Sequence, residues 1–368
     1  MHIGIHILRN YPYTCLNRDG SGEVKQVTFG GSRRTRISSQ CKSYWIRKEV
    51  GDYIKDTSSY DSVRTKHVVG MLFDKLDFIA DIDERQSWAE LAVKALFDSE
   101  IKGKKKVEDE DVLTNYLVAT SPVELDFIAN LIKTDVDNNE IHKNPKAFSK
   151  FHKKALKDKS YITLDIALHG RMLASASHSM IRGAASRAHS ISTHQITLEH
   201  DYFSAIDDYK QEHKIPGAGH VDSQSATSSC FYESSSINYK KLIENLGGNE
   251  ELAKKLIVDY LRPLLLITPR AKSGSMNGNV LPSFVMITMT ENITPMLSNA
   301  FVKAIYGNDI VEESVERLIS FFEDEVIEGA GYDCNSFVWA EKRIKFDTKS
   351  IKRVDGIDGL QKALKESL

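Results

Sequence analysis

The 368-residue chain has few of the residues that mark disulfide-linked, fibrous or membrane-spanning proteins. Its four cysteines lie far apart and form no CxxC pair, which favours free thiols in a reducing cytosol. With only 21 glycines and 8 prolines, collagen-like and low-complexity classes are excluded. The longest aliphatic run, Leu264–Ile267, is far shorter than the roughly 20 residues of a membrane-spanning helix. Because the N-terminal MHIGIHIL also lacks the features of a signal peptide, we expect a soluble cytoplasmic protein with no membrane partner.

Sequence motifs of common enzymes are also missing. There is no GxSxG, HExxH, GxxxxGK[ST] or strand-following GxGxxG, so standard hydrolase, zinc-protease and nucleotide-binding mechanisms lack their parts. His178, His189 and His194 have no paired cysteines, which favours structural roles over metal binding. Asp19 could hold a divalent metal for phosphodiester cleavage, but a single carboxylate in a basic loop is more often a turn residue. We expect no catalytic residue, no metal and no cofactor.

Positive charge is concentrated near the N-terminus of a chain whose formal net charge is only −2. Residues 1–50 hold nine lysines and arginines against three acidic residues, and no acidic residue occurs from Gly31 to Lys48. Negative charge collects in Asp309–Glu328, with eight acidic residues and one arginine. This division is typical of a positive surface for a polyanion and an acidic surface for solubility or a basic neighbour. Charge alone fits a solvated basic surface without a ligand equally well.

Hydrophobic periodicity predicts a mixture of strands and helices. Residues 3–7 alternate between apolar and polar or small side chains, as in a half-buried strand, and residues 164–168 repeat the pattern. Residues 9–30 are rich in glycine and predict a long loop, which a helix capped at Ser38 or Ser39 follows. Residues 56–158 are rich in Lys, Asp and Glu and predict a mostly helical insertion.

The second half of the chain continues this mixture. Residues 193–236 are loop-like, and a helix follows with Asn249 at its N-cap. Ser283–Thr290 is apolar on both faces, as a central strand is, and Thr294 and Pro295 predict the start of another helix. A short strand at Ser336–Ala340 and a charged C-terminal helix complete the pattern. The order of these elements predicts an α+β fold of the split βαβ type.

The segment Phe29–Gln40, FGGSRRTRISSQ, carries the strongest binding signal. It joins two glycines, three arginines and several uncharged hydrogen-bonding residues just before a predicted helix. Glycines allow close backbone approach, arginines bind phosphates through two donors, and a helix N-terminus offers amide groups with positive potential. These features fit any phosphate-rich ligand. Because no aromatic RNP1 octapeptide is present, tracking of a nucleic-acid backbone is favoured over readout of base edges.

Two further segments offer apolar groups that could contact bases. Met172 lies in GRMLASASHSM, and Tyr202, Phe203 and Ile206 lie in EHDYFSAIDD. An aromatic or apolar side chain on a projecting loop can stack on bases or separate them, with about 1–3 kcal/mol per stacked base. Packing in a minor core explains the same residues equally well.

Seven motifs occur in an order that indicates a family resemblance. They are LNRDG (Leu16–Gly20), FGGSRRTRISSQ, SVRTKH (Ser62–His67), DIALHGRM (Asp165–Met172), AHSISTHQI (Ala188–Ile196), DYFSAIDD (Asp201–Asp208) and NLGG (Asn245–Gly248). Together they resemble the CasC family, the CRISPR RNA-binding backbone subunit of the type I-E Cascade surveillance complex. The similarity runs from Met1 to about Ile305 and is loose after Gly329.

The resemblance implies a hand-shaped protein. Its palm would be similar to the ferredoxin-like fold of RNA-recognition motifs and would comprise residues 1–55 and 159–306. Residues 56–158 would form inserted helical fingers, residues 193–236 a long thumb hairpin, and residues 307–368 an acidic helix, a strand and a tail. Family members assemble head to tail along the guide RNA with other Cascade subunits. The thumbs leave short RNA segments exposed for pairing with target DNA.

The resemblance also implies a set of RNA-binding residues. By motif position, Met172 would lie between bases, and the thumb would contribute Tyr202, Phe203, Ile206 and Val221. The family usually continues SSQ with SLKR, whereas Cys41–Tyr44 follows here, so the lysine is displaced by about 100° around the helix. Whether Lys42 or Tyr44 takes over its phosphate contact stays open. The residues expected to hold the RNA backbone are Arg18, Lys25, Arg33, Arg34, Arg36, Ser38, Gln40, Lys42 and Arg47.

Two other functions stay open on the sequence. Related backbone subunits of type III complexes cut target RNA with an aspartate in the corresponding first loop, and Asp19 is the only candidate for that role. A self-assembling protein that is indifferent to RNA is the third alternative. The non-catalytic RNA-binding subunit is the leading hypothesis, because the chain offers groups for phosphates and base faces but no visible carboxylate cluster near Asp19.

Overall fold

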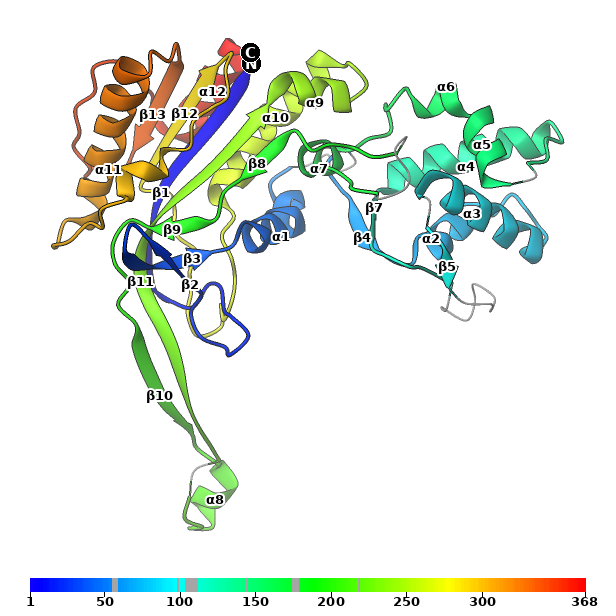
Figure 1. Ribbon diagram of the computed structural model, residues 1–368. Helices are drawn as coiled ribbons and strands as arrows, with labels where there is room; N and C mark the ends of the chain where they lie inside the picture. Colours follow the sequence, from blue (N-terminus) through cyan, green and yellow to red (C-terminus); the bar gives the residue numbers. More distant parts are fainter. Residues whose placement is uncertain (55–58, 98, 103–111, 143, 174–178, 218) are drawn as a thin grey trace. The chain divides into compact units, whose positions relative to one another are not determined.

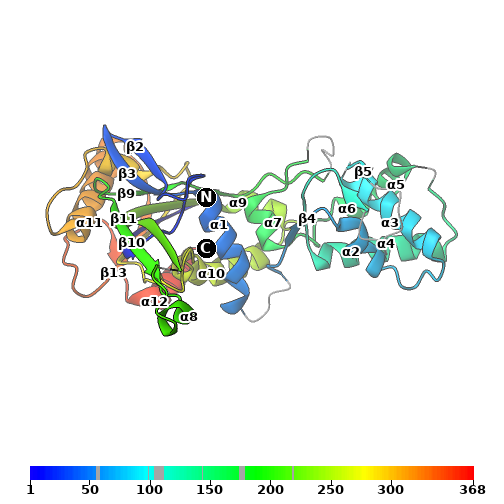
Figure 2. The same ribbon diagram turned by 90° about the horizontal axis from the view of Figure 1, so that it is seen from below.

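The computed structural model describes residues 1–368 except 55–58, 98, 103–111, 143, 174–178 and 218 (Figure 1). The chain divides into two compact units, whose elements Figure 2 shows from a second direction. The first, here called the sheet unit, comprises Met1–Glu49, Arg187–Ser236 and Tyr260–Leu368. The second, the helical unit, comprises Val50–Ser186 and Ile237–Asp259. The functional segments expected from the sequence follow another division and stay predictions.

A large, mainly antiparallel sheet dominates the sheet unit (Figure 1). Its strands are β1 (His2–Thr14), β2 (Gln26–Phe29), β3 (Ser32–Ile37), β8 (Ala185–Arg187), β9 (Ser190–Ser192), β10 (Glu199–Ala205), β11 (His220–Asn238), β12 (Phe284–Thr290), β13 (Asn335–Ala340) and β14 (Lys352–Arg353). They follow the order β14-β13-β12-β1-β11-β9-β3-β2, and β8 and β10 also pair with β11. β13 and β14 run parallel. The predicted α+β class is confirmed, whereas a palm like that of RNA-recognition motifs stays a prediction.

Strands β1 and β12 form the buried centre of the sheet. They pair from His2 with Thr290 to Leu8 with Phe284, and every residue of β12 is buried. Gly4 permits this close packing, because a Cβ at this position would lie 2.4 Å from Oγ1 of Thr288. The strand expected at residues 3–7 is therefore present, but it is buried on both faces and extends to Thr14.

Helices pack on this sheet through apolar side chains. The helices of the sheet unit include α1 (Ser39–Glu49), η3 (Leu297–Phe301), α11 (Ile310–Ser320), η4 (Phe321–Gly329) and α12 (Gly356–Ser367). Val315 and Leu318 of α11 and Phe322 of η4 share one core with Phe284 and Met286 of β12. The acidic segment 309–328 therefore packs against the sheet through its apolar side chains.

A long hairpin within the sheet unit is built from β10 and the first part of β11 (Figure 1). The strands pair from Glu199 with Ala226 to Ala205 with His220, and α8 (Asp208–Glu212) lies in the connection. All seven residues of β10 are exposed, whereas most residues of β11 from Ser225 onward are buried. Glu199–Ala205 and His220–Ala226 thus form a regular hairpin, within residues where periodicity alone predicted a loop.

The helical unit has a core of its own. Its elements include η1 (Val50–Asp52), α2 (Val68–Asp74), α3 (Ile82–Phe97), α4 (Pro122–Asp137), α5 (Pro145–Phe151), α6 (Lys153–Leu156), α7 (Leu164–His169) and α9 (Tyr239–Asn245), with the strand pairs β4 (Val63–Thr65) and β7 (Val118–Thr120), and β5 (Ile101–Lys102) and β6 (Leu113–Thr114). Leu72 of α2, Phe97 of α3 and Ile132 of α4 meet in the main apolar cluster. In the described part of residues 56–158, helices are the main regular structure, and the inserted helical subdomain with these bounds stays a prediction.

Several element predictions are corrected by the structure. Residues 164–168 are helical, because Leu164, Ile166, Ala167 and Leu168 are all buried and the segment ends in a glycine with φ of 77°. Residues 9–30 contain the end of β1 and all of β2 in place of one long loop. The helix expected from Thr294 is a single short 3₁₀ turn, η3. The helix after Asn249 is present as α10 (Glu250–Leu266), and Asn249 caps it through the backbone N–H of Leu252.

Candidate nucleic-acid interface

Asn17 fixes the loop of residues 17–25 against the end of β3. This loop, called the basic loop after Arg18 and Lys25, also contains Asp19 and Glu23. Its backbone carbonyl accepts a hydrogen bond from the amide of Lys25 at 2.8 Å, and its side-chain oxygen accepts one from the amide of Ser38 at 2.9 Å. The carbonyl of Lys25 in turn accepts from the amide of Arg36 at 2.8 Å. These contacts bring exposed Arg18 and partly buried Lys25 and Arg36 into one region of the sheet unit. Asn17 was not among the predicted site residues, although an Asn in a loop motif is the type that makes such bonds.

This basic loop also lies at the base of the long hairpin. The amide of Val24 donates a hydrogen bond to Oγ of Ser225 in β11 at 3.2 Å. Val24, Ala226 and Met276 share a small apolar cluster. Farther along, the amide of Ile196 donates to the carbonyl of Arg33 at 2.9 Å. The loop, β3 and the hairpin therefore form one connected region.

The positive charge of this region acts on His189. Ser39 donates its backbone N–H to Nδ1 of His189 at 3.0 Å. Burial, together with the nearby charges of Arg36 and Lys25, lowers the pKa of His189. The imidazole is therefore neutral at physiological pH and accepts a hydrogen bond at the start of α1, in agreement with the structural role expected for it.

The arginines of β3 divide between solvent and core. Arg33 is exposed, whereas Arg34 is fully buried. The guanidinium of Arg34 donates to the carbonyls of Ser192, Thr193 and Phe301 at 2.9 Å and to that of Val302 at 3.3 Å. A phosphate cannot reach it without breaking this packing. The candidate interface therefore excludes Arg34, which the sequence pattern could not separate from its neighbours.

The two glycines before β3 have a local role. Gly30 and Gly31 connect Phe29 of β2 to Ser32 of β3 as a two-residue turn, and both have positive φ, 58° and 79°. A Cβ on Gly30 would lie 1.7 Å from the carbonyl oxygen of Val302. These glycines permit a tight turn between β2 and β3 and the close contact of Gly30 with Val302. The expected close approach to a phosphate is therefore not needed to explain them.

Helix α1 offers fewer free donors than its sequence suggested. Ser38 is its N-cap and accepts from the amide of Cys41 through Oγ at 3.2 Å, which confirms the expected helix start. Because Ser38 is buried and makes this bond, its expected phosphate contact is replaced by a capping role. Gln40 is exposed at the first turn, and Arg47 is partly buried and has a partner of its own.

Lys42 points into the sheet unit. Its ammonium group forms an ion pair with Glu233 of β11, and both side chains are buried. Arg9 lies on the same carboxylate, with its Nε 3.5 Å from Oε1 of Glu233. Burial lowers the pKa of Lys42 to about 8 despite the attraction of Glu233. The displaced lysine is therefore a structural cation and leaves the candidate interface, whereas Tyr44 of the same helix is exposed.

Asp19 organises the basic loop through one carboxylate oxygen. Its Oδ1 accepts from the backbone N–H of Ser21 at 2.9 Å, from the Ser21 hydroxyl at 2.7 Å and from the amide of Glu23 at 3.2 Å. The hydrogen bond from the Ser21 hydroxyl is the main reason that its pKa is lowered. This is the geometry of a turn residue, as expected from the sequence.

The hairpin presents apolar side chains to solvent on both of its faces. Tyr202 pairs with Ser223 and Phe203 with Asp222, so these two neighbouring aromatic residues point to opposite faces. Val221, opposite Ser204, shares the face of Tyr202. The exposed fractions are 72% for Tyr202, 40% for Phe203, 72% for Ile206 and 47% for Val221. The alternative that these residues pack a minor core is wrong.

Met172 belongs to the helical unit and is 90% exposed. The preceding Arg171 is buried and binds both carboxylate oxygens of Glu124, at 2.8 and 2.7 Å. Met172 lines a cavity of about 750 Å³. Its wall also contains Arg64 and Arg182, which the sequence did not assign to any site, although Arg64 lies in the motif SVRTKH. The helical unit thus offers an exposed apolar side chain beside two arginines.

The sheet unit thus presents a loop with two cations, Arg18 and Lys25, beside a solvent-exposed hairpin. The chain matches the family model described as CT1975-like protein over residues 3–363, and it belongs to this family. Among proteins with curated descriptions, none matches the sequence. In the described part of the chain, no helix is both long enough and apolar enough to cross a membrane.

Two solved structures contain chains with this fold. One is titled as a CRISPR RNA-guided surveillance complex, pre-nicking; its chain is 25% identical, with a TM-score of 0.82 and coverage of 100% of both chains. The other is titled as a CRISPR RNA-guided surveillance complex; its chain is 22% identical, with a TM-score of 0.73 and the same coverage. The second likeness concerns the fold alone.

Proposed function

We propose that this chain is a non-catalytic CRISPR RNA-binding subunit that forms the backbone of a type I-E Cascade complex. In this role it assembles head to tail with copies of itself and with other Cascade subunits, and it holds the guide RNA for pairing with target DNA. The observation that carries the proposal is the match over the full length of both chains to a chain of a CRISPR RNA-guided surveillance complex. The ordered CasC-like motifs support the type I-E assignment.

The charged groups of the interface support a grip on the RNA backbone. Arg18 and Arg33 are exposed, and Lys25 and Arg36 are partly exposed, within the region that Asn17 and Ser225 hold together. Cations on a fixed loop bind phosphates whatever the base sequence, which suits a subunit that must accept any guide. Sequence recognition is then delegated to base pairing, as in other RNA-guided systems.

The hairpin supports a second kind of RNA contact. Tyr202 and Phe203 stand on opposite faces of a two-stranded ribbon with no covering layer on β10. A ribbon of this form can fold over a single strand and place an aromatic or apolar side chain against a base face. Met172 offers a second such side chain from the helical unit.

Head-to-tail assembly agrees with the division of charge between two segments of the sheet unit. A basic N-terminal segment and the acidic segment 309–328 can face each other between copies, which gives a heterologous contact that leaves both filament ends open. Other subunits are then needed to cap the ends. The absence of catalysis is part of this proposal, and it is supported by Asp19, whose Oδ1 already accepts three hydrogen bonds within its own loop.

Co-purification tests the proposal directly. The full chain, expressed with the remaining Cascade subunits and a CRISPR array, should retain a discrete RNA of uniform length and several copies of itself per complex. The double variant Arg18→Ala/Arg33→Ala should retain less RNA, whereas Lys365→Ala, which removes an exposed lysine from α12, should retain as much as the unmodified chain. A complex that assembles without RNA would show instead a self-assembling protein indifferent to RNA.

A further inference from the structure

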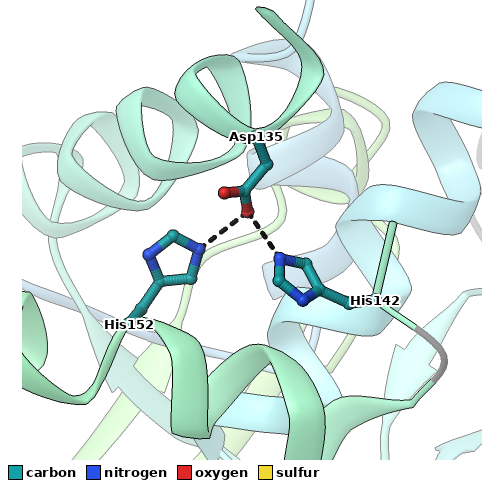
Figure 3. Close-up of side chains that lie close together, drawn as sticks. All are labelled: Asp135, His142 and His152. Atoms are coloured by element: carbon teal, nitrogen blue, oxygen red, sulfur yellow. Dashed lines mark hydrogen bonds and ion pairs between the residues drawn. The ribbon is translucent and has the colours of Figure 1, made fainter. Parts of the chain in front are cut away.

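Three potential metal ligands converge in the helical unit, in a region that the proposed function does not use. Asp135 lies near the end of α4, His142 in the connection to α5, and His152 directly after α5. Their side chains point toward one another in Figure 3. One ligand atom from each residue lies within 4.8 Å of the others. Residues 17 positions apart in sequence are thus gathered at one point.

The geometry of this cluster is compact. Nε2 of His142 lies 2.9 Å and Nε2 of His152 lies 2.7 Å from the same carboxylate oxygen, Oδ2 of Asp135. Ligand atoms of a tetrahedral zinc ion, with bonds of about 2.0–2.1 Å, lie about 3.3 Å apart. Binding of such an ion would therefore lengthen these nitrogen–oxygen distances by about 0.4–0.6 Å.

The second oxygen of Asp135 is the unusual feature. The side chains of Asp135, His142 and His152 are only 1%, 5% and 7% exposed. Both imidazoles nevertheless approach Oδ2, and Oδ1 has no hydrogen-bond partner among the described residues although it is buried. A carboxylate that served only to accept two hydrogen bonds would be better satisfied with one donor on each oxygen. Oδ1 therefore keeps lone pairs that a cation can use.

The surroundings favour a structural ion. The rings of Phe148 and Phe151 lie 5.3 and 5.1 Å from that of His142, and the ring of Trp88 lies 6.1 Å away. This aromatic wall leaves little room for a substrate and shields the ligands from bulk solvent. Imidazole and carboxylate ligands suit Zn²⁺, and two neutral imidazoles with one carboxylate leave a fourth position for a water molecule.

We propose that Asp135, His142 and His152 bind one Zn²⁺ ion, which ties the end of α4 to the segment that contains α5 and α6. The ion cross-links residues 135–152 and stabilises the helical unit. This site is separate from the RNA-binding role, since no residue of the candidate interface belongs to it. It also revises the sequence-based expectation of no metal.

Metal uptake by the full, tag-free chain tests this proposal. After removal of metal with a chelator, the protein is titrated with Co²⁺ as a spectroscopic substitute and with Zn²⁺ in competition. We expect one equivalent of Co²⁺ per chain, with the intense visible absorption of a four-coordinate site, and displacement by Zn²⁺. Uptake below about one tenth of an equivalent, or a weak six-coordinate spectrum, would overturn the proposal and leave a hydrogen-bonded His–Asp–His cluster.

Variants assign the ligands. His142→Ala and His152→Ala should each weaken metal binding by more than the roughly 10–100-fold typical of residues that only support a ligand. His200→Ala, which removes an exposed histidine of β10, should leave binding unchanged. If the alanine variants fail to fold, His152→Cys decides the matter, because a thiolate ligand adds a sulfur-to-cobalt charge-transfer band. A folded His152→Cys protein with bound Co²⁺ but without this band would contradict the assignment.

Discussion

Lys42 and Glu233 form a buried ion pair that joins α1 to β11 across 191 positions of sequence. Arg9 shares the carboxylate and also donates to the carbonyls of Leu265 and Val280, at 2.6 and 2.7 Å. Burial alone would raise the pKa of Glu233, but the charges of Lys42 and Arg9 outweigh it, so the pKa of this carboxyl is lowered. The three charges therefore form one structural unit.

Removal of Lys42 should therefore destabilise the protein without changing its contact with nucleic acid. We expect Lys42→Met to lower the free energy of unfolding by about 3–5 kcal/mol, because Glu233 loses one of its two cationic partners in the core. Urea unfolding followed by circular dichroism measures this loss. Lys48→Met, an exposed change on the same helix, should cost less than about 1 kcal/mol. If the Lys42→Met protein had normal stability but bound RNA more weakly, Lys42 would be an RNA-binding residue after all.

Arg18 and Arg34 should behave differently although both belong to the predicted basic set. Arg18→Ala should reduce the slope of log K against log salt concentration by about 0.7 for single-stranded RNA, since one phosphate contact is lost. Arg34→Ala should lower the free energy of unfolding by at least about 3 kcal/mol, since four carbonyls lose a charged donor. Fluorescence anisotropy over a salt series and thermal melting of both variants separate the two effects. Equal melting temperatures for the two variants would contradict this division.

The aromatic residues of the hairpin should affect RNA protection at regular positions. The double variant Tyr202→Ala/Phe203→Ala should keep its fold, because both side chains are exposed. Its free energy of RNA binding should be weaker by about 1–3 kcal/mol for each base that one of these rings stacks on. Nuclease footprinting of the guide in the assembled complex is the measurement. Since the two rings lie on opposite faces, the single variants should expose different nucleotides. Ser204→Ala serves as the control, and an unchanged footprint in the double variant would count against the role of the hairpin.

Asp19 distinguishes a binding subunit from a ribonuclease. The assembled complex, incubated with complementary RNA and magnesium, should leave that RNA intact, and Asp19→Ala should not alter the result. The variant should only loosen the basic loop, because three hydrogen bonds within it are lost. Periodic cleavage of the RNA that Asp19→Ala abolishes would reverse the assignment. An Asp77→Ala variant, exposed in the helical unit, controls for general effects of charge removal.

His6 should make the protein sensitive to acid. Burial lowers the pKa of His6 to about 3 from an ordinary value of 6.5, and its ring nitrogens contact the hydroxyls of Tyr232 and Thr288 at 2.8 and 3.4 Å. Between these values the unfolded chain binds a proton that the folded chain does not, so stability falls as the pH falls. From pH 7.5 to pH 5 this group should account for a loss of about 2 kcal/mol.

His6→Gln removes that proton while keeping a donor and an acceptor in place. Urea unfolding at both pH values should therefore show a smaller loss for His6→Gln than for the unmodified chain. His200→Gln, on the exposed β10, should behave like the unmodified chain. An equal loss of stability in His6→Gln would place the acid sensitivity elsewhere.

Local patterns in the sequence predicted much of the fold. The cap at Ser38, the cap at Asn249 and the central strand before Thr290 each depend on a few neighbouring residues, and each is present. Residues 164–168 are helical where the alternation predicted a strand. Five residues are too few to distinguish the period of a helix from that of a strand when every apolar side chain is buried. The hairpin was visible only through the family resemblance, because its exposed strand has no hydrophobic alternation to detect.

The candidate site was less predictable, since long-range contacts decide which charges face solvent. Neighbouring Arg33 and Arg34 have the same chemistry, and only the carbonyls of residues 192–193 and 301–302 distinguish them. The partner of Lys42 lies on a strand that no local pattern connects to α1. The cluster of Asp135, His142 and His152 has no recognised spacing and becomes visible only when the helices pack.

The exposed hairpin of β10 and β11 should be stabilised by the molecules that bind to it. A two-stranded hairpin is by itself only marginally stable in water, so the part of this hairpin beyond the sheet has little support of its own. A molecule that binds against Tyr202 and Phe203 covers their apolar surface and stabilises the hairpin. In the proposed head-to-tail assembly, each further copy should therefore bind more tightly than the first.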